Sequence, residues 1–465
     1  MKLSLSIILA WFISVSNYPA ALAVNAVCDP NQGGQNYCCP AVGASGIVTI
    51  AANVQMIPNA FNSCARLTSI TFATANTLLI IASQALFNCT ALSSIAIPNS
   101  VISLGAVAFS SCPSLTSVTI GSSLRSIPDF TFYDCAKLRS IVIPNTVTSM
   151  GMYVFGACSA LTSVTIGSGV TMLPDYAFYG CSSLTSIIIP KTVTTLGLGV
   201  FASCTGLTPV TIGSGVKMLS NSTFFYCSAL TSIVIPNTVT SMGNSVFGAC
   251  SALTSVTIGS GVSTLPDSTF LGCSALTSIT IPKTITSLGP AVFALCTSLA
   301  SIVIPNTVTS VGTYLFSLCT SLTTVTMPNH LASHISTTAG VSDFDGTYFV
   351  DTNFVTCAQL SSNTPVTYAW TGTAEAITPV CPVSTHAPTS TPITAPTTTT
   401  ASTETTFAST NAGQVVIAGI VIVGFLLVII LSVLYLPCFA RYKGYIIPGR
   451  AGQAAVDRVP LVEKV

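Results

Sequence analysis

The chain has 465 residues, half of them hydrophobic and only 5% charged, with a net charge of +1. Soluble domains carry about 25% charged residues, so the apolar excess must lie in a membrane or in a large protein core. The low charge and the lack of a basic block exclude nucleic acid as a partner, because affinity for it depends on neutralising phosphates.

The N-terminal residues 1–23 have the pattern of a secretory signal peptide. Lys2 precedes an apolar run, and Ala21-Leu22-Ala23 has the small residues of a cleavage site. An uncleaved anchor helix is the alternative, although the run is short and contains several serines. Residues 24–60 are then expected to form an N-terminal cap. Cys28, Cys38 and Cys39 lie there, and the sequence leaves open whether one of them pairs with Cys64.

An internal repeat follows, and its cysteines define the period. The first interval between them is 25 residues and the other ten are 23. Leu lies three residues after each Cys and Ile or Val six after. In most units Ile lies eight after, and Phe lies three before the next Cys. The segment Leu-x-x-Ile-x-Ile predicts a strand with apolar residues inward, and a 23-residue period is typical of leucine-rich repeats. The repeat cysteines are Cys64, Cys89, Cys112, Cys135, Cys158, Cys181, Cys204, Cys227, Cys250, Cys273, Cys296 and Cys319.

A second rhythm doubles the period to 46 residues. The strand is followed alternately by Ile-Pro-Asn/Lys-Thr, as at 143–146, and by Ile-Gly-Ser, as at 166–168. Pro and Gly end strands, so two kinds of turn are expected to alternate along one edge of the stack.

The motif Leu-Thr-Ser-Ile-x-Ile-Pro-x-x-Val-Thr-Ser-Leu-Gly-x-x-x-Phe-x-x-Cys closely resembles the BspA-type leucine-rich repeat, for example at 276–296. The resemblance covers about 270 of the 465 residues. It implies a right-handed, curved β-solenoid with a parallel sheet over residues 61–327, and a surface protein used in adhesion by bacteria and protists. The family shares no catalytic residues, so none is assigned here.

The strand residues five and seven after each Cys are expected to face outward and to bind a ligand. A repetitive hydroxyl and methyl surface adds weak contacts through avidity, although Ser, Thr and Val are also simply good strand residues. The candidate ligand-binding residues are Ser117, Thr119, Ser140, Ser163, Thr165, Ser186, Ser232, Ser255, Thr257, Ser278, Thr280 and Ser301. Val142, Ile188, Val234 and Val303 share these outward positions.

The repeat cysteines are expected to form a buried ladder of free thiols. Pairing between successive coils is the alternative, and metal binding would require clustered spacing such as CxxC. His330 and His334 alone make a weak metal site, the aspartates are repeated turn residues, and no cofactor or metal is expected. Asn88 and Asn221 lie in glycosylation sequons, with Asn221 the more accessible of the two.

Residues 328–383 are expected to form a C-terminal cap, in which Cys357 and Cys381 are candidates for a disulfide. Residues 384–413 are rich in Thr and Pro and predict an extended, O-glycosylated stalk.

A transmembrane helix is predicted over residues 414–436. Val415 to Leu436 contains no charge, and 22 helical residues span about 33 Å. Arg441 and Lys443 follow and mark residues 437–465 as a cytoplasmic tail, in which Cys438 is a candidate for palmitoylation. A GPI signal is the alternative, but nearly thirty residues follow the span.

Together these features predict a non-enzymatic, single-pass type I protein of the plasma membrane. Its extracellular solenoid would bind a protein or glycan ligand, such as the matrix or another cell surface. A signalling receptor that acts through the short tail and a structural surface-coat protein are the alternatives.

Overall fold

The structure is a computed structural model, and it describes residues 39, 42, 45–50, 56, 58–72, 80–331, 365–370 and 377–380. The predicted signal peptide, stalk, transmembrane helix and tail lie outside these residues. So do Cys28, Cys38, His334, Cys357, Cys381 and Cys438. Within the described ranges, no helix has the length and hydropathy needed to cross a bilayer.

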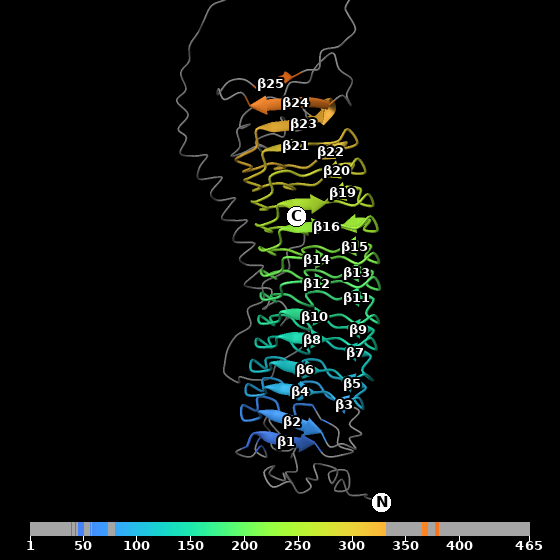
Figure 1. The fold of residues 1–465 in the computed structure, drawn as a ribbon, viewed down its shortest axis with the longest axis vertical. Helices are drawn as coiled ribbons and strands as arrows, with labels where there is room; N and C mark the ends of the chain where they lie inside the picture. Colours follow the sequence, from blue (N-terminus) through green and yellow to red (C-terminus); the bar gives the residue numbers. More distant parts are fainter. Residues whose placement is uncertain are drawn as a thin grey trace, which may run out of the picture. The chain divides into compact units, whose positions relative to one another are not determined.

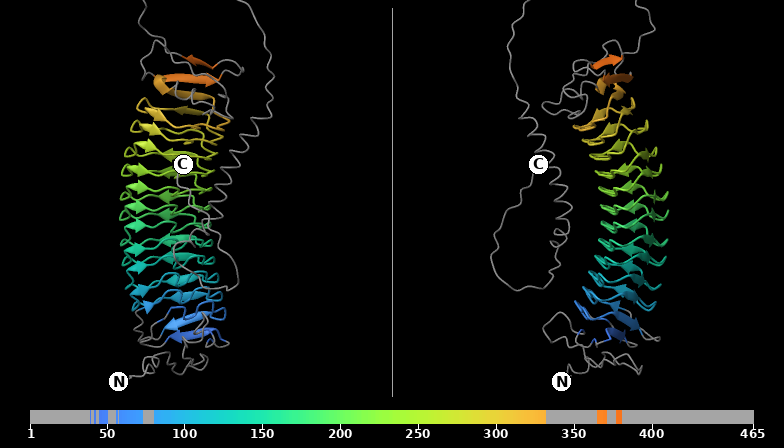
Figure 2. Two further views of the ribbon diagram at one scale, coloured as in Figure 1. Left: turned by 180° about the vertical axis from the view of Figure 1, so that it is seen from behind. Right: turned by 60° about the vertical axis from the view of Figure 1, so that its left-hand side comes forward.

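The repeat region is a stack of coils, nearly all of which contribute one strand to a first parallel sheet (Figure 1). The coil at 278–281 contributes only the bridge between Thr280 and Val303. The strands carry the predicted Ile/Val-x-Ile segment, with Phe72 in β2 and Met327 in β23 at its last position. The stack curves along its length, as expected (Figure 2). The strands are β1 (Ile47–Ile50), β2 (Ser69–Phe72), β4 (Ser94–Ala96), β6 (Ser117–Thr119), β8 (Ser140–Val142), β10 (Ser163–Thr165), β12 (Ile187–Ile188), β14 (Val210–Thr211), β16 (Ser232–Val234), β18 (Ser255–Thr257), β21 (Ser301–Val303) and β23 (Thr324–Pro328).

Each coil also contributes a two-residue strand to a second parallel sheet, which the sequence analysis did not predict. In the coil that contains β8, Val147 and Met150 are buried while the residues between them are exposed. Two-residue strands are too short to show the period-two pattern on which strand prediction depends. The second sheet consists of β3 (Ile80–Ile81), β5 (Ser103–Leu104), β7 (Ser126–Ile127), β9 (Ser149–Met150), β11 (Met172–Leu173), β13 (Thr195–Leu196), β15 (Met218–Leu219), β17 (Ser241–Met242), β19 (Thr264–Leu265), β20 (Ser287–Leu288) and β22 (Ser310–Val311).

The strand register follows the repeat. Ser140 pairs with Ser163, and Ser232 pairs with Ser255, so equivalent residues of successive coils lie side by side. The prediction of parallel pairing is confirmed, but the first sheet is divided into several ladders rather than one. Pro209 occupies the position that Ser holds in other coils, and it has no N–H to donate to the ladder.

At the C-terminal end, the 3-10 helix η3 (Asn329–Leu331) follows β23. The antiparallel strands β24 (Pro365–Trp370) and β25 (Ile377–Val380) then extend the first sheet beyond β23. Both strands lie inside the range 328–383 predicted as a cap. Pairing with β24 satisfies the backbone groups that β23 would otherwise present as an open edge.

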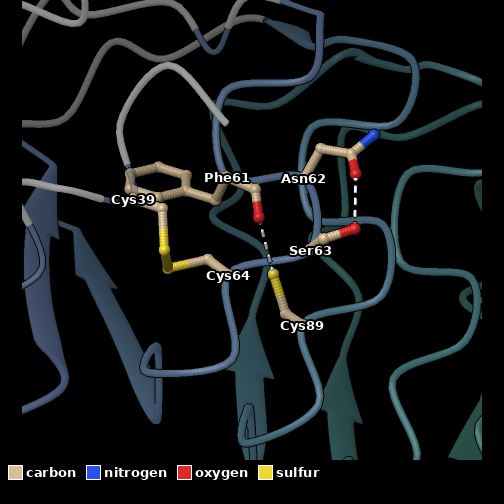
Figure 3. Close-up of a disulfide and its surroundings, with 6 residues drawn as sticks. All are labelled: Cys39, Phe61, Asn62, Ser63, Cys64 and Cys89. Atoms are coloured by element: carbon tan, nitrogen blue, oxygen red, sulfur yellow. Dashed lines mark hydrogen bonds between the residues drawn. A yellow bond between two sulfur atoms is a disulfide. The ribbon is translucent and has the colours of Figure 1, made fainter. Parts of the chain in front are cut away.

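At the N-terminal end, Cys39 forms a disulfide with Cys64 (Figure 3). This pairing answers the question that the sequence left open. Cys89, at the equivalent place in the next coil, donates a hydrogen bond from its thiol to the Phe61 carbonyl at 3.0 Å (Figure 3). The disulfide therefore lies at the start of the cysteine ladder and ties residue 39 to the first coil.

The core consists of apolar ladders that run through the coils. Ten phenylalanines from Phe109 to Phe316 are fully buried. Neighbouring rings stack, as Phe178 does with Phe201, at 5.5 Å between ring centroids and 5° between planes. The predicted inward orientation of the Leu, Ile, Phe and Cys positions is confirmed.

Candidate ligand-binding face

The outward side chains of the first sheet form two columns along the stack. The first column consists of the residues five after each Cys, from Ser94 to Thr324, and the second of those seven after, from Ala96 to Thr326. All twelve residues predicted to bind a ligand are exposed in these columns. Ser186 and Ser278 lie just before a strand or bridge rather than inside a strand. Their role in binding stays a prediction.

The serine hydroxyls of the first column are free within the described part of the chain. No hydrogen bond joins the side chain of Ser140 or Ser163, or of the other candidate serines, to a described residue. The threonines one position earlier differ. Thr162 Oγ1 donates to the Arg139 carbonyl at 3.0 Å, and Thr254 Oγ1 donates to the Thr231 carbonyl at 3.1 Å. One hydroxyl column thus stabilises the coils while its neighbour remains available to solvent or a ligand.

At or beyond each end of the second column, threonines of neighbouring strands bond to one another. Thr49 of β1 and Thr71 of β2 share a hydrogen bond of 2.9 Å, and Thr326 bonds to Thr367 of β24 at 2.8 Å. Within the column, apolar residues separate Thr119, Thr165 and Thr211, whereas Thr257 and Thr280 follow one another. Thr165 lies between Val142 and Ile188, so its hydroxyl has no hydroxyl neighbour in the same column.

The apolar members of the second column are strongly exposed, and they were missed as candidate binding residues. Val142 and Val234 are 61% exposed and Ile188 is 70% exposed. Val142, Ile188 and Val234 lie 46 residues apart, and that recurrence is the signal that the sequence offered; the next apolar member, Val303, follows Val234 by 69 residues. Large exposed apolar side chains are more informative when they repeat at fixed positions than when they are scattered.

Neither column carries a charged residue between residues 94 and 326. Lys137 and Arg139 lie close to the columns in sequence but occupy other positions of one coil. The groups that the two columns present to solvent are therefore hydroxyl groups and methyl groups.

The repeat cysteines from Cys89 onward are free thiols and fully buried, as predicted. Each donates a hydrogen bond to a backbone carbonyl of the preceding coil, 26 residues earlier in most cases, which the sequence did not reveal. Cys158, for example, donates to the Phe132 carbonyl at 3.2 Å. Burial raises the pKa of Cys158, Cys204 and Cys250 to about 12, and a backbone hydrogen bond offsets only part of this effect. At neutral pH these thiols are protonated, and a protonated thiol is neither a nucleophile nor a metal ligand.

We expect the described thiols of the folded chain to resist iodoacetamide at pH 8 and to be alkylated only after denaturation.

The raised thiol pKa also makes the stability of the fold depend on pH. An unfolded thiol ionises near its ordinary pKa of 9.0, so the contribution of Cys158 to stability is complete below that pH. It is lost as the pH rises from 9 to about 12. Mass spectrometry of alkylated peptides measures the reactivity of the thiols. Urea titrations between pH 8 and pH 11 measure the change in stability. Rapid alkylation of the native chain at Cys158 would contradict this burial.

The aspartates at the turns act on the backbone of the next coil. Asp129 Oδ1 accepts from the Met152 N–H at 2.8 Å, and Asp175 Oδ1 accepts from the Leu198 N–H at 2.7 Å. Asn221 replaces aspartate in its coil and accepts from the Asn244 N–H at 2.9 Å. Across the described ranges, no group of three His, Cys, Asp or Glu residues has the arrangement of a metal site.

A second aromatic cluster lies on the turns. Phe130, Tyr153 and Tyr176 stack in sequence, with centroids 5.2 Å and 4.7 Å apart. Tyr133 and Tyr179 meet this stack edge-on. The rings cover one another's faces, so the cluster stabilises the coils and offers edges rather than faces to solvent.

The two sequon asparagines differ in accessibility. Asn221 is exposed, whereas Asn88 is half-buried, has a φ of 54° and donates to Ser63 Oγ at 3.3 Å. This difference agrees with the expectation that Asn221 is the more accessible acceptor; glycosylation of either stays a prediction.

The chain matches the family model of the BspA type leucine-rich repeat region, with matches at residues 54–184, 125–251 and 217–339. No curated protein matches the sequence. Among solved structures, a leucine-rich repeat protein from Bacteroides ovatus is 26% identical, with a TM-score of 0.50 over 60% of this chain and 78% of that one.

Two further structures are similar. A leucine-rich cell surface protein from Faecalibacterium prausnitzii is 31% identical, with a TM-score of 0.41 over 60% of this chain and 82% of its own. A leucine-rich repeat protein from Eubacterium ventriosum is 22% identical, with a TM-score of 0.44 over 70% of this chain and 96% of its own.

Proposed function

Because the chain belongs to the BspA-type leucine-rich repeat family, we propose that it is a cell-surface recognition protein that binds its ligand through the two outward columns of the first sheet. The observation that carries the proposal is the row of exposed serine hydroxyls, in register from coil to coil and without partners among the described residues. Such a row repeats one weak contact along a rigid support, which raises affinity for an extended ligand.

The composition of the face supports binding rather than catalysis. Acid–base and nucleophilic catalysis require titratable groups held close together, and the columns contain none. Asp129 and Asp175 each accept a hydrogen bond from a backbone N–H, and the thiols are buried and protonated. A leucine-rich repeat solenoid is typically a binding or scaffold fold, and the proposal assigns this chain to that class.

The proposed location is the outer face of the plasma membrane. The sequence features that support it are the signal-peptide pattern at 1–23, the Thr-rich segment 384–413 and the apolar segment 414–436 followed by Arg441 and Lys443. In this arrangement the stalk raises the solenoid above the membrane and leaves the first sheet accessible to a partner.

Lysine substitutions on the first sheet are expected to abolish ligand binding. The purified full-length chain is first tested for saturable binding to matrix proteins, glycans and whole cells. In the combined variant Ser163→Lys/Thr165→Lys/Ile188→Lys, we expect at least a tenfold loss of affinity, about 1.4 kcal/mol, because bulky charges enter an uncharged contact.

The matched control is Met172→Lys/Met218→Lys. These methionines are 49% and 39% exposed and lie on the second sheet of the same region. Binding within twofold of the parent chain is expected, and circular dichroism verifies that both variants fold. Equal losses in both variants, or no saturable ligand for a folded chain, would count against the proposed face.

A further inference from the structure

We propose that the ligand of the two columns is a neutral, linear, β-1,4-linked glycan that lies along the axis of the stacked coils. This inference rests on the proposed function and assigns the chemical class of the ligand. It depends on the charge of the face, on its free hydroxyls and on the period of its apolar residues.

The charge of the face favours a neutral polymer. A polyanion or polycation would lose hydration on the columns without gaining an ion pair, because no charged residue lies in either column between residues 94 and 326. Protein partners, in turn, bind best through buried Tyr, Trp and Arg anchors, and the columns contain none of these residues. Sugar hydroxyls can bond to the serine and threonine hydroxyls of the columns, and sugar C–H groups can pack on the exposed valine and isoleucine side chains.

The hydroxyls of the face are free to bond to sugar hydroxyls. A Ser side chain offers one donor and two acceptor sites, and the serines of the first column have no partner among the described residues. In the second column, Val142 and Ile188 separate Thr165 from the next threonines. Neighbouring threonines can bond to one another, as Thr49 does with Thr71 at 2.9 Å, whereas Thr165 makes no such bond.

The apolar residues recur at the period of a β-1,4-linked chain. Val142, Ile188 and Val234 lie two coils apart, and at a strand spacing of about 4.8 Å two coils extend ~9.6 Å. Consecutive hexoses in a β-1,4 chain are rotated by about half a turn relative to each other. Every second sugar therefore presents the same edge to the protein. Each sugar is about as long as one strand spacing, so the exposed side chains, at 61%, 70% and 61%, meet equivalent C–H patches of alternate sugars.

Addition of an extended peptide as a further strand is disfavoured at the C-terminal end of the first sheet. There, β24 already pairs with β23 along five residues. The columns themselves project from the sheet face rather than from its edge, so a ligand meets side chains and not free backbone groups.

The test measures binding of the full-length chain to oligosaccharides by isothermal titration calorimetry. Cellohexaose and fully N-acetylated chitohexaose represent the neutral β-1,4 class. Maltohexaose controls for the linkage, and a β-1,4-linked hexamannuronate controls for the charge. We expect a neutral β-1,4 hexaose to bind at least tenfold more tightly than either control. We also expect its affinity to rise from the disaccharide to the hexaose and to stay within twofold between 50 and 500 mM salt.

The variant Val142→Ser/Ile188→Ser/Val234→Ser is expected to lose at least tenfold in affinity for the same hexaose. These side chains are exposed, so the fold should tolerate the change, and Met172→Ser/Met218→Ser on the second sheet is the matched control. Equal affinity for maltohexaose, or tighter binding of the hexamannuronate, would overturn the inference. So would binding of a protein but of no glycan through the first sheet, and that result would leave the proposed function standing. Failure to bind any ligand through the first sheet would overturn both.

Discussion

Replacement of Phe201 by alanine is expected to lower the free energy of unfolding by about 3–5 kcal/mol. Phe201 is fully buried, and its ring stacks on Phe178 and on Phe224 at 5.5 Å in each case. Truncation removes the apolar burial of the ring and leaves a cavity between two coils that cannot close independently. Urea denaturation followed by circular dichroism measures the change.

Phe201→Ala should also split unfolding into two transitions, because each coil of a solenoid contacts only its neighbours and the stability of the array is a sum of such contacts. A second, lower transition is expected for one half of the array when the centre is weakened. Ile188→Ala is the control, since that side chain is 70% exposed and its loss should change stability by no more than about 0.5 kcal/mol. A change below 1 kcal/mol in Phe201→Ala would contradict the role of the ladder.

Loss of the Cys39–Cys64 disulfide should have the next largest effect on stability. The bond joins residues 25 apart in sequence, and closure of a loop of this size stabilises by roughly 3 kcal/mol in the chain-entropy model. The variant Cys39→Ala/Cys64→Ala is expected to lose this amount in the N-terminal coils. Hydrogen exchange at β1 and β2 should accelerate more than exchange at β16 and β18.

Reductant provides the control for the disulfide. Dithiothreitol should reproduce the effect of the double variant on hydrogen exchange at β1 and β2 of the parent chain. It should leave exchange at these two strands unchanged in the double variant, because the described cysteines from Cys89 onward are free thiols. Identical melting of the parent chain and the double variant in the absence of reductant would show that the bond does not support the first coils.

The repeat was predictable because each of its signals recurs at the same position in every coil. The inward Leu, Ile, Phe and Cys positions, the outward Ser and Thr positions and the parallel register all follow from a period of 23 residues. Asp175 and Asp267 were interpreted as copies of one turn residue. Asp129 and Asp175 make equivalent hydrogen bonds to the next coil, whereas Asp267 faces Pro290, which has no N–H to donate.

Other features depend on contacts between coils that a single repeat does not display. The thiol of Cys158 bonds to a carbonyl 26 residues earlier, and the partner of Cys64 lies outside the repeat. Two-residue strands such as β9 carry too short a pattern to be recognised. The exposure of Val142 and Ile188 was predicted, but their value for binding becomes apparent only beside the bonded threonine pairs at the ends of the sheet.

The alternation between two kinds of coil bears on how an array of this type changes length during evolution. Tyr133 lies beside Gly156, where a Cβ atom would come within 3.1 Å of the ring, and Phe225 lies in the same way beside Gly248. Likewise, Asn145 Oδ1 accepts from the Ser168 N–H in the next coil at 2.9 Å, and Asn237 accepts from Ser260 at the same distance.

A duplication or deletion of 46 residues restores every such large–small and Asn–Ser pairing at the new junction. A change of 23 residues would instead set two large side chains, or two small ones, against each other. Between residues 97 and 281, where the two kinds of turn alternate, insertions and deletions should therefore add or remove whole pairs of coils. The Ile-Pro turns at 281–282 and 304–305 lie one coil apart, so the array also contains one single-coil step.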